Sequence, residues 1–243
     1  MTTLTMDGLQ VYKDKNKYCV SIAGSMTNQP SITALDNLKN VGEKFFELKD
    51  ISKDTGKADK YIFKYETPAN AKNLLSAKNG HEILKLSLLN EVIKDDMLNQ
   101  RDVFIPLIHP ANIFFMDMKT IRYMYTDNGE LYTSKKPALE QYKALIVSMM
   151  TKYSYEKMLN AAVRKDILQK HSNVFLIQIE KCKTIEEMQK LLDNRLNKTE
   201  SDFFLFRLRE ENEIRRKATI KLTVTMVCAI ISVAILFMIL IGL

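Results

Sequence analysis

The chain has few of the residues that catalytic and metal sites most often use. Its 243 residues include seven glycines, three cysteines and three histidines. The glycines never form Gly-x-Gly-x-x-Gly, the pattern of a phosphate-cradling loop. The cysteines are Cys19, Cys182 and Cys228, which lack metal-ligand spacing and are too few for a disulfide framework. We therefore expect no bound metal, no cofactor and a reducing compartment.

The chain also lacks internal repeats, Gly/Ser-rich linkers and, at its N-terminus, the apolar core of a signal peptide. Its formal net charge is +7. Residues 207–221 hold six basic and three acidic side chains, so much of the excess lies in one short segment. This concentration argues against nucleic acid as a partner, because the positive charge is not spread over a domain surface.

The one long apolar run is Leu222 to Leu243, 22 residues without a charge or a proline. At 1.5 Å per residue such a helix crosses a hydrocarbon core of about 30 Å. A basic flank lies on its N-terminal side and comprises Arg215, Arg216, Lys217 and Lys221. The positive-inside rule then places residues 1–221 in the cytoplasm, and predicts a single-pass protein of the cell membrane.

Alternating residues in the first third of the chain predict a small antiparallel sheet. One hairpin runs from Leu9 to about Gly24, and a second is formed by "FFELKDIS" and "KYIFKYE" around a polar turn. Helices are expected from Pro68 and, more strongly, over "HEILKLSLLNEVIKDD". Short strands joined by turns follow in "DVFIPLIHPANIFFMDMKTIRYMYTDNGELY". The fold class is therefore α+β.

The character becomes helical from Pro137, with helices over "PALEQYKALIVSMMTKY" and "YSYEKMLNAAVRKDILQKH". A third helix begins at "TIEEMQKLL", where Thr184 and Glu187 have capping-box spacing. This helix either runs nearly unbroken into the predicted span or packs on the domain with a hinge at residues 199–201. We thus expect a domain over 1–183 (a sheet lobe over about 1–100, then a helical lobe), a stalk over 184–221 and a membrane helix over 222–243.

This order of elements, with "IHPANIFF", "TIRYMYTDNGEL" and "YKALIVSMMTKYSYEKML" before a basic-flanked span, resembles the EssB/YukC family of type VII secretion systems in Gram-positive bacteria. The resemblance implies a compact protein-kinase-like, or pseudokinase, cytoplasmic domain. Family members carry a further extracytoplasmic domain after the span. The resemblance therefore implies a native chain that continues past Leu243, or a shortened member.

The kinase chemistry can be checked position by position. Kinases use a catalytic-loop Asp, an Asn and a second Asp for magnesium, and a Lys for phosphates. Aligning Pro-x-Asn places Asn112 at the magnesium Asn and Leu107 at the catalytic Asp, and Leu cannot accept a proton. Tyr125 falls at the second Asp unless Asp127 shifts into that role. These degenerate positions predict that the chain has no catalytic residues.

Other polar residues have simpler roles than catalysis. We interpret Asn112 as a turn residue that hydrogen-bonds backbone between two strands. Lys64 is a conceivable phosphate lysine, but a solvated strand lysine is the simpler interpretation. His109 has no Ser, Cys or Asp at motif spacing, which favours a loop or interior histidine. His81 and His171 lie near helix ends and indicate capping.

Three functions fit these features. The first is a non-catalytic membrane-anchored scaffold that, as the resemblance implies, self-associates and recruits an FtsK/SpoIIIE-type secretion ATPase and other subunits. The second is a divergent membrane kinase using Asp117 or Asp127 with magnesium. The third is a tail-anchored coiled-coil protein, because the stalk has near-heptad apolar spacing. The expected self-association residues, as a homodimer, are Leu192, Leu196, Phe203 and Phe206.

Overall fold

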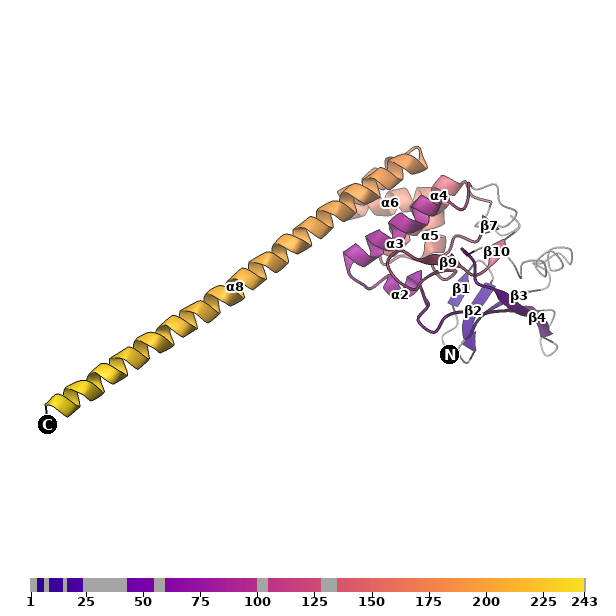
Figure 1. The fold of residues 1–243 in the computed structure, drawn as a ribbon. Helices are drawn as coiled ribbons and strands as arrows, with labels where there is room; N and C mark the ends of the chain where they lie inside the picture. Colours follow the sequence, from indigo (N-terminus) through magenta and orange to yellow (C-terminus); the bar gives the residue numbers. More distant parts are fainter. Residues whose placement is uncertain are drawn as a thin grey trace. The chain divides into compact units, whose positions relative to one another are not determined.

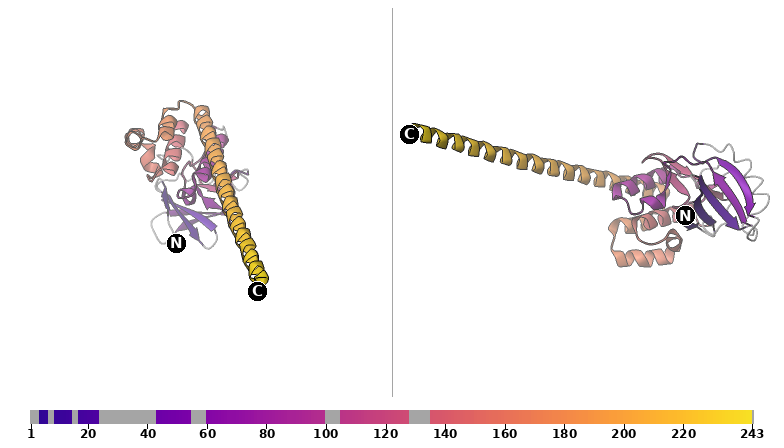
Figure 2. Two further views of the ribbon diagram at one scale, coloured as in Figure 1. Left: turned by 90° about the vertical axis from the view of Figure 1, so that its left-hand side faces the viewer. Right: turned by 90° about the horizontal axis from the view of Figure 1, so that it is seen from below.

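The computed structural model describes residues 4–6, 9–14, 17–23, 43–54, 60–99, 105–127 and 135–242, except the side chains of residues 4–6, 23, 54, 127, 171, 228–234 and 236–241. The chain forms two compact units, residues 1–196 and 197–243. Within the first unit the larger sheet and the helices α4–α6 lie at opposite ends, with the short strands between them (Figures 1 and 2). The unit boundary falls later than the domain boundary expected after residue 183.

The larger sheet is antiparallel and has the strand order β1-β2-β3-β5-β4. Both predicted hairpins are confirmed, because β2 pairs with β3 and β4 pairs with β5. The first strand, β1, was not predicted. The strands are β1 (Leu4–Met6), β2 (Leu9–Asp14), β3 (Lys17–Ala23), β4 (Leu48–Asp54) and β5 (Lys60–Tyr65).

The helical stretch predicted from Pro68 is wrong in its extent. Residues Lys72–Asn73 form a short strand, β6, and only Leu74–Ala77 are helical, as α2. The Asn73 side chain accepts a hydrogen bond from the Ser76 N–H at 3.2 Å, and so fixes the helix start later than proline alone suggested. The stronger prediction is confirmed as α3 (Glu82–Asp95), with His81 at its N-cap.

Short strands follow α3, as predicted, and the described residues of this region contain β7 (Ile105–Pro106), β8 (Ile113–Phe115), β9 (Ile121–Tyr123) and β10 (Thr126–Asp127). Strands β6, β8 and β9 form one sheet, and β7 pairs with β10. The segment "IPLIHPANIFF" therefore consists of two strand ends joined by a turn, in which the N–H groups of Asn112 and Ile113 donate to the carbonyl of His109.

The region after Pro137 is helical as predicted, but it has more helices. The stretch "YSYEKMLNAAVRKDILQKH" is divided at Asn160, whose side chain caps the second helix by accepting from the Ala162 and Val163 N–H groups. A further helix, α7, was not predicted. The helices are α4 (Ala138–Met150), α5 (Tyr155–Leu159), α6 (Ala161–His171) and α7 (Val174–Lys181).

The last helix, α8 (Ile185–Ile241), is continuous through residues 199–201, which agrees with the unbroken-helix alternative and not with the alternative of a hinge there. Its start has the predicted cap, since the Glu187 N–H donates to Thr184 Oγ1 at 3.1 Å. Residues up to Leu196 pack in the first unit, where Leu192 is fully buried. The remainder of α8 forms the second unit.

The described buried side chains of the first unit form two hydrophobic cores. The sheet core is built on strands β2–β5, and the helical core contains α3, α4 and α7. Helix α3 belongs to the helical core, so helical packing begins earlier than the expected lobe boundary near residue 100. The segment around β8 supplies both cores: Leu107, Ala111 and Phe114 face the sheet core, whereas Ile108 and Ile113 face the helical core.

Candidate functional site

Asn112 is the best-defined polar group of the loop that resembles a catalytic loop. Its Nδ2 donates to the carbonyls of Leu107 at 2.9 Å and Tyr125 at 2.7 Å, and its Oδ1 accepts from the Tyr125 N–H at 2.7 Å. The residue has no exposed surface. The predicted role of Asn112, bonding backbone between two strands, is confirmed. Both amide hydrogens are used, and no open face remains for an ion.

Leu107 and Tyr125, the two positions aligned with the kinase aspartates, are apolar or aromatic members of the sheet core. Leu107 is fully buried and Tyr125 is 5% exposed. The Tyr125 ring packs edge-on against Phe63, with ring centroids 5.7 Å apart. The structure therefore brings Leu107, Asn112 and Tyr125 together in a buried and packed environment.

Asp117, one of the two candidate aspartates of a divergent kinase, has a structural role in a turn. Asp117 closes the β8–β9 turn by accepting from the N–H groups of Lys119 and Thr120 and from the Thr120 hydroxyl. The Lys119 N–H contributes most to lowering the pKa of this exposed carboxyl. The side chain of Asp127 lies outside the described residues. Within the described ranges, no group of three His, Cys, Asp or Glu side chains is arranged to hold a metal ion.

Lys64, the conceivable phosphate lysine, lies on the surface of the sheet. Its ammonium pairs with Asp50 at 2.8 Å, and the two residues are directly opposite each other on β5 and β4. The side chains are 38% and 50% exposed. A cross-strand surface pair explains Lys64 without a phosphate, in agreement with the simpler interpretation of the sequence.

His109 is an interior histidine with both ring nitrogens engaged, which confirms the simpler prediction for it. Its Nδ1 accepts from the Ala111 N–H at 3.0 Å, so the proton is on Nε2, which lies 2.8 Å from Glu156 Oε1. The hydrogen bond from His109 is the main cause that lowers the pKa of Glu156 to about 2. This pair joins the loop before β8 to the start of α5.

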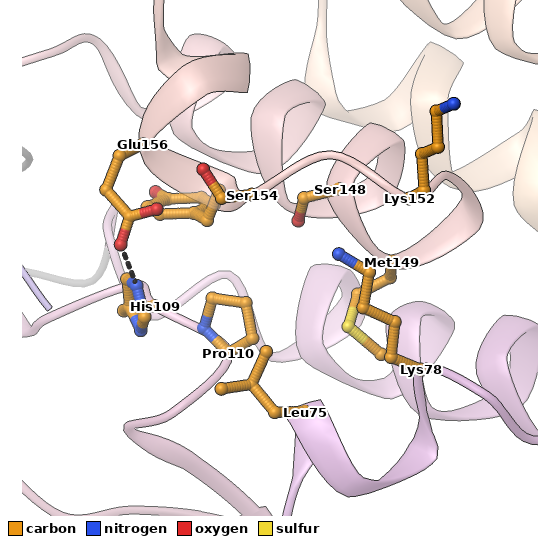
Figure 3. A pocket seen from close by; sticks show the side chains of 10 residues that line it. Leu75, Lys78, His109, Pro110, Ser148, Met149, Lys152, Ser154 and Glu156 are labelled. Carbon is orange, nitrogen blue, oxygen red and sulfur yellow. Dashed lines mark hydrogen bonds and ion pairs between the residues drawn. The ribbon is translucent and has the colours of Figure 1, made fainter. Parts of the chain in front are cut away.

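A cavity of about 220 Å³ lies beside the His109–Glu156 pair (Figure 3). Leu75 and Lys78 come from α2 and the residue after it, and His109 and Pro110 come from the loop. The opposite wall is the end of α4 and the start of α5, and includes Ser148, Met149, Lys152, Ser154, Tyr155 and Glu156. This cavity was not predicted from the sequence, because its lining is assembled from three separate segments.

Buried Arg164 fixes the helices behind that wall. Its Nε bonds to Glu180 on α7, and Nη2 bonds to Glu140 on α4. Nη1 donates to the carbonyl of Met158 on α5 at 2.7 Å. Burial is the largest single influence on the pKa of Glu140 and raises it, but the hydrogen bonds and charges of Arg164 and Lys143 together outweigh burial, and the pKa is lowered. Arg164 was not predicted as a structural centre, since one Arg in a polar helix has no distinguishing pattern.

The second unit exposes a band of large apolar side chains on α8. Phe203 is 41% exposed, and its ring lies 5.6 Å from the guanidinium of Arg207. The other members of the band are Phe204 at 63%, Leu205 at 50%, Phe206 at 56% and Leu208 at 40% exposure. The predicted basic flank, Arg215, Arg216, Lys217 and Lys221, is also exposed.

The predicted self-association stripe is therefore divided between the units. Leu192 has no exposed surface and Leu196 packs against the helical core, because the start of α8 completes that core. Leu192 is therefore not accessible to a second chain, and Leu196 is partly covered by its own chain. Phe203 and Phe206 remain exposed in the second unit.

No helix in the described part of the chain has the length and hydropathy needed to cross a bilayer. The side chains of residues 228–234 and 236–241, a large part of the predicted span, lie outside the described residues.

A family model described as "WXG100 protein secretion system (Wss), protein YukC" matches residues 31–241. The chain belongs to the YukC family. The resemblance to EssB/YukC proteins is thus confirmed. No curated protein matches this YukC-family chain.

Two EssB cytoplasmic fragments of known structure have the same fold as this YukC-family chain. The EssB cytoplasmic fragment of Geobacillus thermodenitrificans is 13% identical, with a TM-score of 0.58 over 81% of this chain and 91% of that one. The Staphylococcus aureus EssB cytoplasmic fragment is 16% identical, with a TM-score of 0.53 over 73% and 98%. The Drosophila melanogaster PAN3 pseudokinase is more distant, at 10% identity and a TM-score of 0.46 over 86% and 64%. The mixed α and β fold predicted from the sequence is confirmed.

Proposed function

We propose that this YukC-family chain is a non-catalytic, membrane-anchored scaffold of a type VII secretion system. The observation that carries the proposal is the amide of Asn112, which is committed to the backbone of Leu107 and Tyr125. A kinase uses this Asn for a magnesium ion. Here the same side chain stabilises a turn, so the loop retains its shape for packing and binding.

The positions on either side of Asn112 support the same conclusion. Leu107 stands where the alignment expects the proton-accepting Asp, and Tyr125 where it expects the magnesium Asp. Neither side chain supplies a carboxylate, and both are buried in the sheet core. The described part of the chain offers no replacement cluster for a metal. Phosphoryl transfer depends on these charges, so their loss favours a binding role.

The membrane anchor of the proposed scaffold is residues 222–243, with residues 184–221 as a helical stalk that follows a cytoplasmic domain over 1–183. The 22-residue apolar run and its basic flank support this arrangement, with the N-terminus inside. The continuous α8 supports the stalk, because one helix joins the two segments without a break.

The partners of the proposed scaffold are a second copy of the chain, an FtsK/SpoIIIE-type ATPase and other secretion subunits. Membership of a secretion-system family supports the last of these. The exposed apolar band at residues 203–208 supports association through α8, because contiguous large apolar side chains on a helix usually mark an interface.

Thermal unfolding of the full chain in detergent, with and without magnesium-ATP, tests the non-catalytic role. A ligand at a hundredfold excess over its Kd stabilises a protein by about 2.7 kcal/mol. We expect no shift in Tm. A robust shift that is abolished by Asn112→Asp and retained by the surface variant Asn99→Asp would overturn the proposal. Co-purification of the secretion ATPase with the tagged chain from native membranes tests the scaffold role, and failure to co-purify would contradict it.

A further inference from the structure

We propose that the basic flank of α8 binds the anionic headgroups of the membrane, and so gives the anchor a preference for anionic over zwitterionic phospholipids. The inference rests on the membrane anchor of the proposed function and deepens it, by naming the class of lipid that the anchor selects. The flank lies wholly within the second unit, and its side chains are described. Its members are Arg215, Arg216, Lys217 and Lys221.

The charge of this part of α8 is of one sign. Residues 214–243 carry four basic side chains, all of them in the basic flank, and no acidic side chain. The nearest carboxylates in the sequence are Glu213 and Glu211, on the side away from the apolar run, and no ion pair joins them to the flank in the described part of α8. The four cations are also exposed. They are therefore available to an external anion.

The position of the flank matches the headgroup layer of a bilayer. At about 1.5 Å per residue, Lys221 lies about 1.5 Å and Arg215 about 10.5 Å before Leu222, the first residue of the apolar run. The polar layer is about 5–8 Å deep on each side of the hydrocarbon core. Long Lys and Arg side chains extend along a helix to reach such a layer. With residues 222–243 in the core, all four cations thus reach the depth of the lipid phosphates.

The arrangement of the cations around α8 favours lipid over a protein partner. Successive residues of an α-helix are about 100° apart, so Arg215, Arg216 and Lys217 point in three different directions. An acidic protein surface would contact only the cations on one side of the helix, and a helix that lies along a membrane carries its cations on one face. A helix that stands through the headgroup layer contacts lipid on every side. Anionic lipids around an upright helix therefore use the whole flank.

The hydroxyl groups beside the flank need no partner from the lipid. Thr219, Thr223 and Thr225 each donate to the backbone carbonyl four residues earlier, at 2.9, 2.9 and 2.8 Å. Such bonds satisfy polar side chains within their own helix, as a segment that enters lipid requires. The charged groups are the ones left to interact with headgroups, and Arg and Lys bind phosphate oxygens through short, charge-assisted hydrogen bonds.

Fluorescence quenching by brominated lipids tests the proposal, because the chain has no tryptophan. Val224→Trp places one fluorophore just inside the apolar run, at a side chain that is 56% exposed. The full chain is reconstituted in vesicles of equal parts phosphatidylglycerol and phosphatidylcholine, with bromine on the acyl chains of one lipid or the other. We expect brominated phosphatidylglycerol to quench more strongly, with an association constant at least about threefold that of phosphatidylcholine.

Two fourfold variants of this Trp-containing chain distinguish the flank from the total charge. The first changes the whole basic flank to Gln and should make the two association constants about equal. The matched control removes two Lys and two Arg that are exposed on the same helix, the nearest about 20 Å before Leu222 and so beyond the screening length of about 8 Å in physiological salt. Its preference should be unchanged. The control substitutions are Lys190→Gln, Lys198→Gln, Arg207→Gln and Arg209→Gln.

Equal quenching of the unmodified flank by the two lipids would overturn the proposal and would favour an acidic protein surface as its partner. A preference that survives in the basic-flank variant, or that the control loses equally, would also overturn it. If the fourfold flank variant does not enter the vesicles, Lys217→Gln combined with Lys221→Gln replaces it, and an unchanged preference there is the contradicting result.

The same vesicles separate lipid headgroups from free phosphate, and the lipid preference from the anchor. Inorganic phosphate should reduce the preference no more than chloride at equal ionic strength, and a larger reduction would assign the flank to free phosphate instead. Quenching by neither lipid would refute the membrane anchor itself. Equal quenching by both lipids would leave the anchor in place and refute only the preference, so the two failures are distinguishable.

Discussion

Asn112 holds Tyr125 by both polar ends of its side chain, donating to the Tyr125 carbonyl and accepting from the Tyr125 N–H, each at 2.7 Å. The two residues are thirteen positions apart and follow different strands. The side-chain amide of Asn112 thus forms the same two kinds of hydrogen bond with Tyr125 that a residue on a neighbouring strand would form. It does so at a point where the strands end. The turn before β8 is fixed by this contact.

We expect Asn112→Ala to lower the free energy of unfolding by about 2–3 kcal/mol. The variant leaves the buried Tyr125 N–H and the Leu107 carbonyl without their side-chain partner, and each buried unpaired group costs about 1–3 kcal/mol. The Tyr125 carbonyl keeps the Leu107 N–H at 3.2 Å. Urea unfolding followed by circular dichroism measures the loss. Asn99→Ala, in an exposed turn, is the control, and an equal loss in both variants would contradict the assignment.

Arg164→Met is expected to destabilise the first unit by about 3–5 kcal/mol, because it leaves the carboxylates of Glu140 and Glu180 partly buried without their shared cation. Arg195→Met serves as the comparison. It breaks a half-exposed pair with Glu82 and should cost about 0–1 kcal/mol. Urea unfolding measures the free energy of unfolding of both variants. Similar losses would contradict the prediction that the buried Arg164 pairs stabilise the fold more than the half-exposed Arg195 pair.

Stability should depend on pH through Glu156. Its pKa is lowered from 4.5 to about 2 in the folded chain, so the carboxylate stabilises the fold fully above pH 4.5 and this contribution is lost as the pH falls towards 2. The Glu156→Gln variant should therefore lose less stability than the wild type between pH 5 and pH 2. Denaturant unfolding across this range measures the difference. Glu43→Gln, an exposed substitution, should follow the wild type, and parallel curves for all three chains would refute the prediction.

A single span with the N-terminus inside is expected from the basic flank that ends at Lys221. Reporter fusions should place a tag at residue 1 in the cytoplasm and a tag after Leu243 outside. Changing Arg215, Arg216 and Lys217 together to Gln should reduce the fraction of correctly oriented chains. The opposite reporter pattern in the unmodified chain would defeat the assignment.

Association through α8 predicts a restricted pattern of disulfide cross-linking. Single cysteines along residues 192–206, in a chain without Cys19, Cys182 and Cys228, should cross-link in membranes at positions 203 and 206. Position 192 should not react, because Leu192 is fully buried in its own chain. A negligible cross-linking yield at every position would show that this part of the helix does not form the dimer contact.

The sequence predicted the sheet hairpins, α3 and the identity of the Asn112 turn because each has a local cause. Alternation at Leu9 and Val11 depends on neighbours in sequence, and so does the capping box of Thr184 and Glu187. The break at Asn160 was missed because the apolar pattern continues across it, and only the capping contacts of the Asn side chain reveal it.

The parts of the site that the sequence did not predict depend on distant contacts. The pair of His109 and Glu156 joins residues 47 positions apart, and Lys78 reaches the carbonyl of Tyr153 from 75 positions away. Contacts between residues so far apart produce no periodic pattern in the sequence. Leu192 was assigned to an interface for a related reason: its apolar spacing is the same whether it faces a second chain or its own core.

Strand β8 supplies side chains to both cores in alternation, with Ile113 on one side and Phe114 on the other. We therefore expect the two cores to unfold together, so that the first unit melts in one cooperative transition. Amide hydrogens at β8 should exchange only through that global opening, at the slowest rates in the chain. The segment that resembles a kinase catalytic loop would thus link the unfolding of the sheet core to that of the helical core.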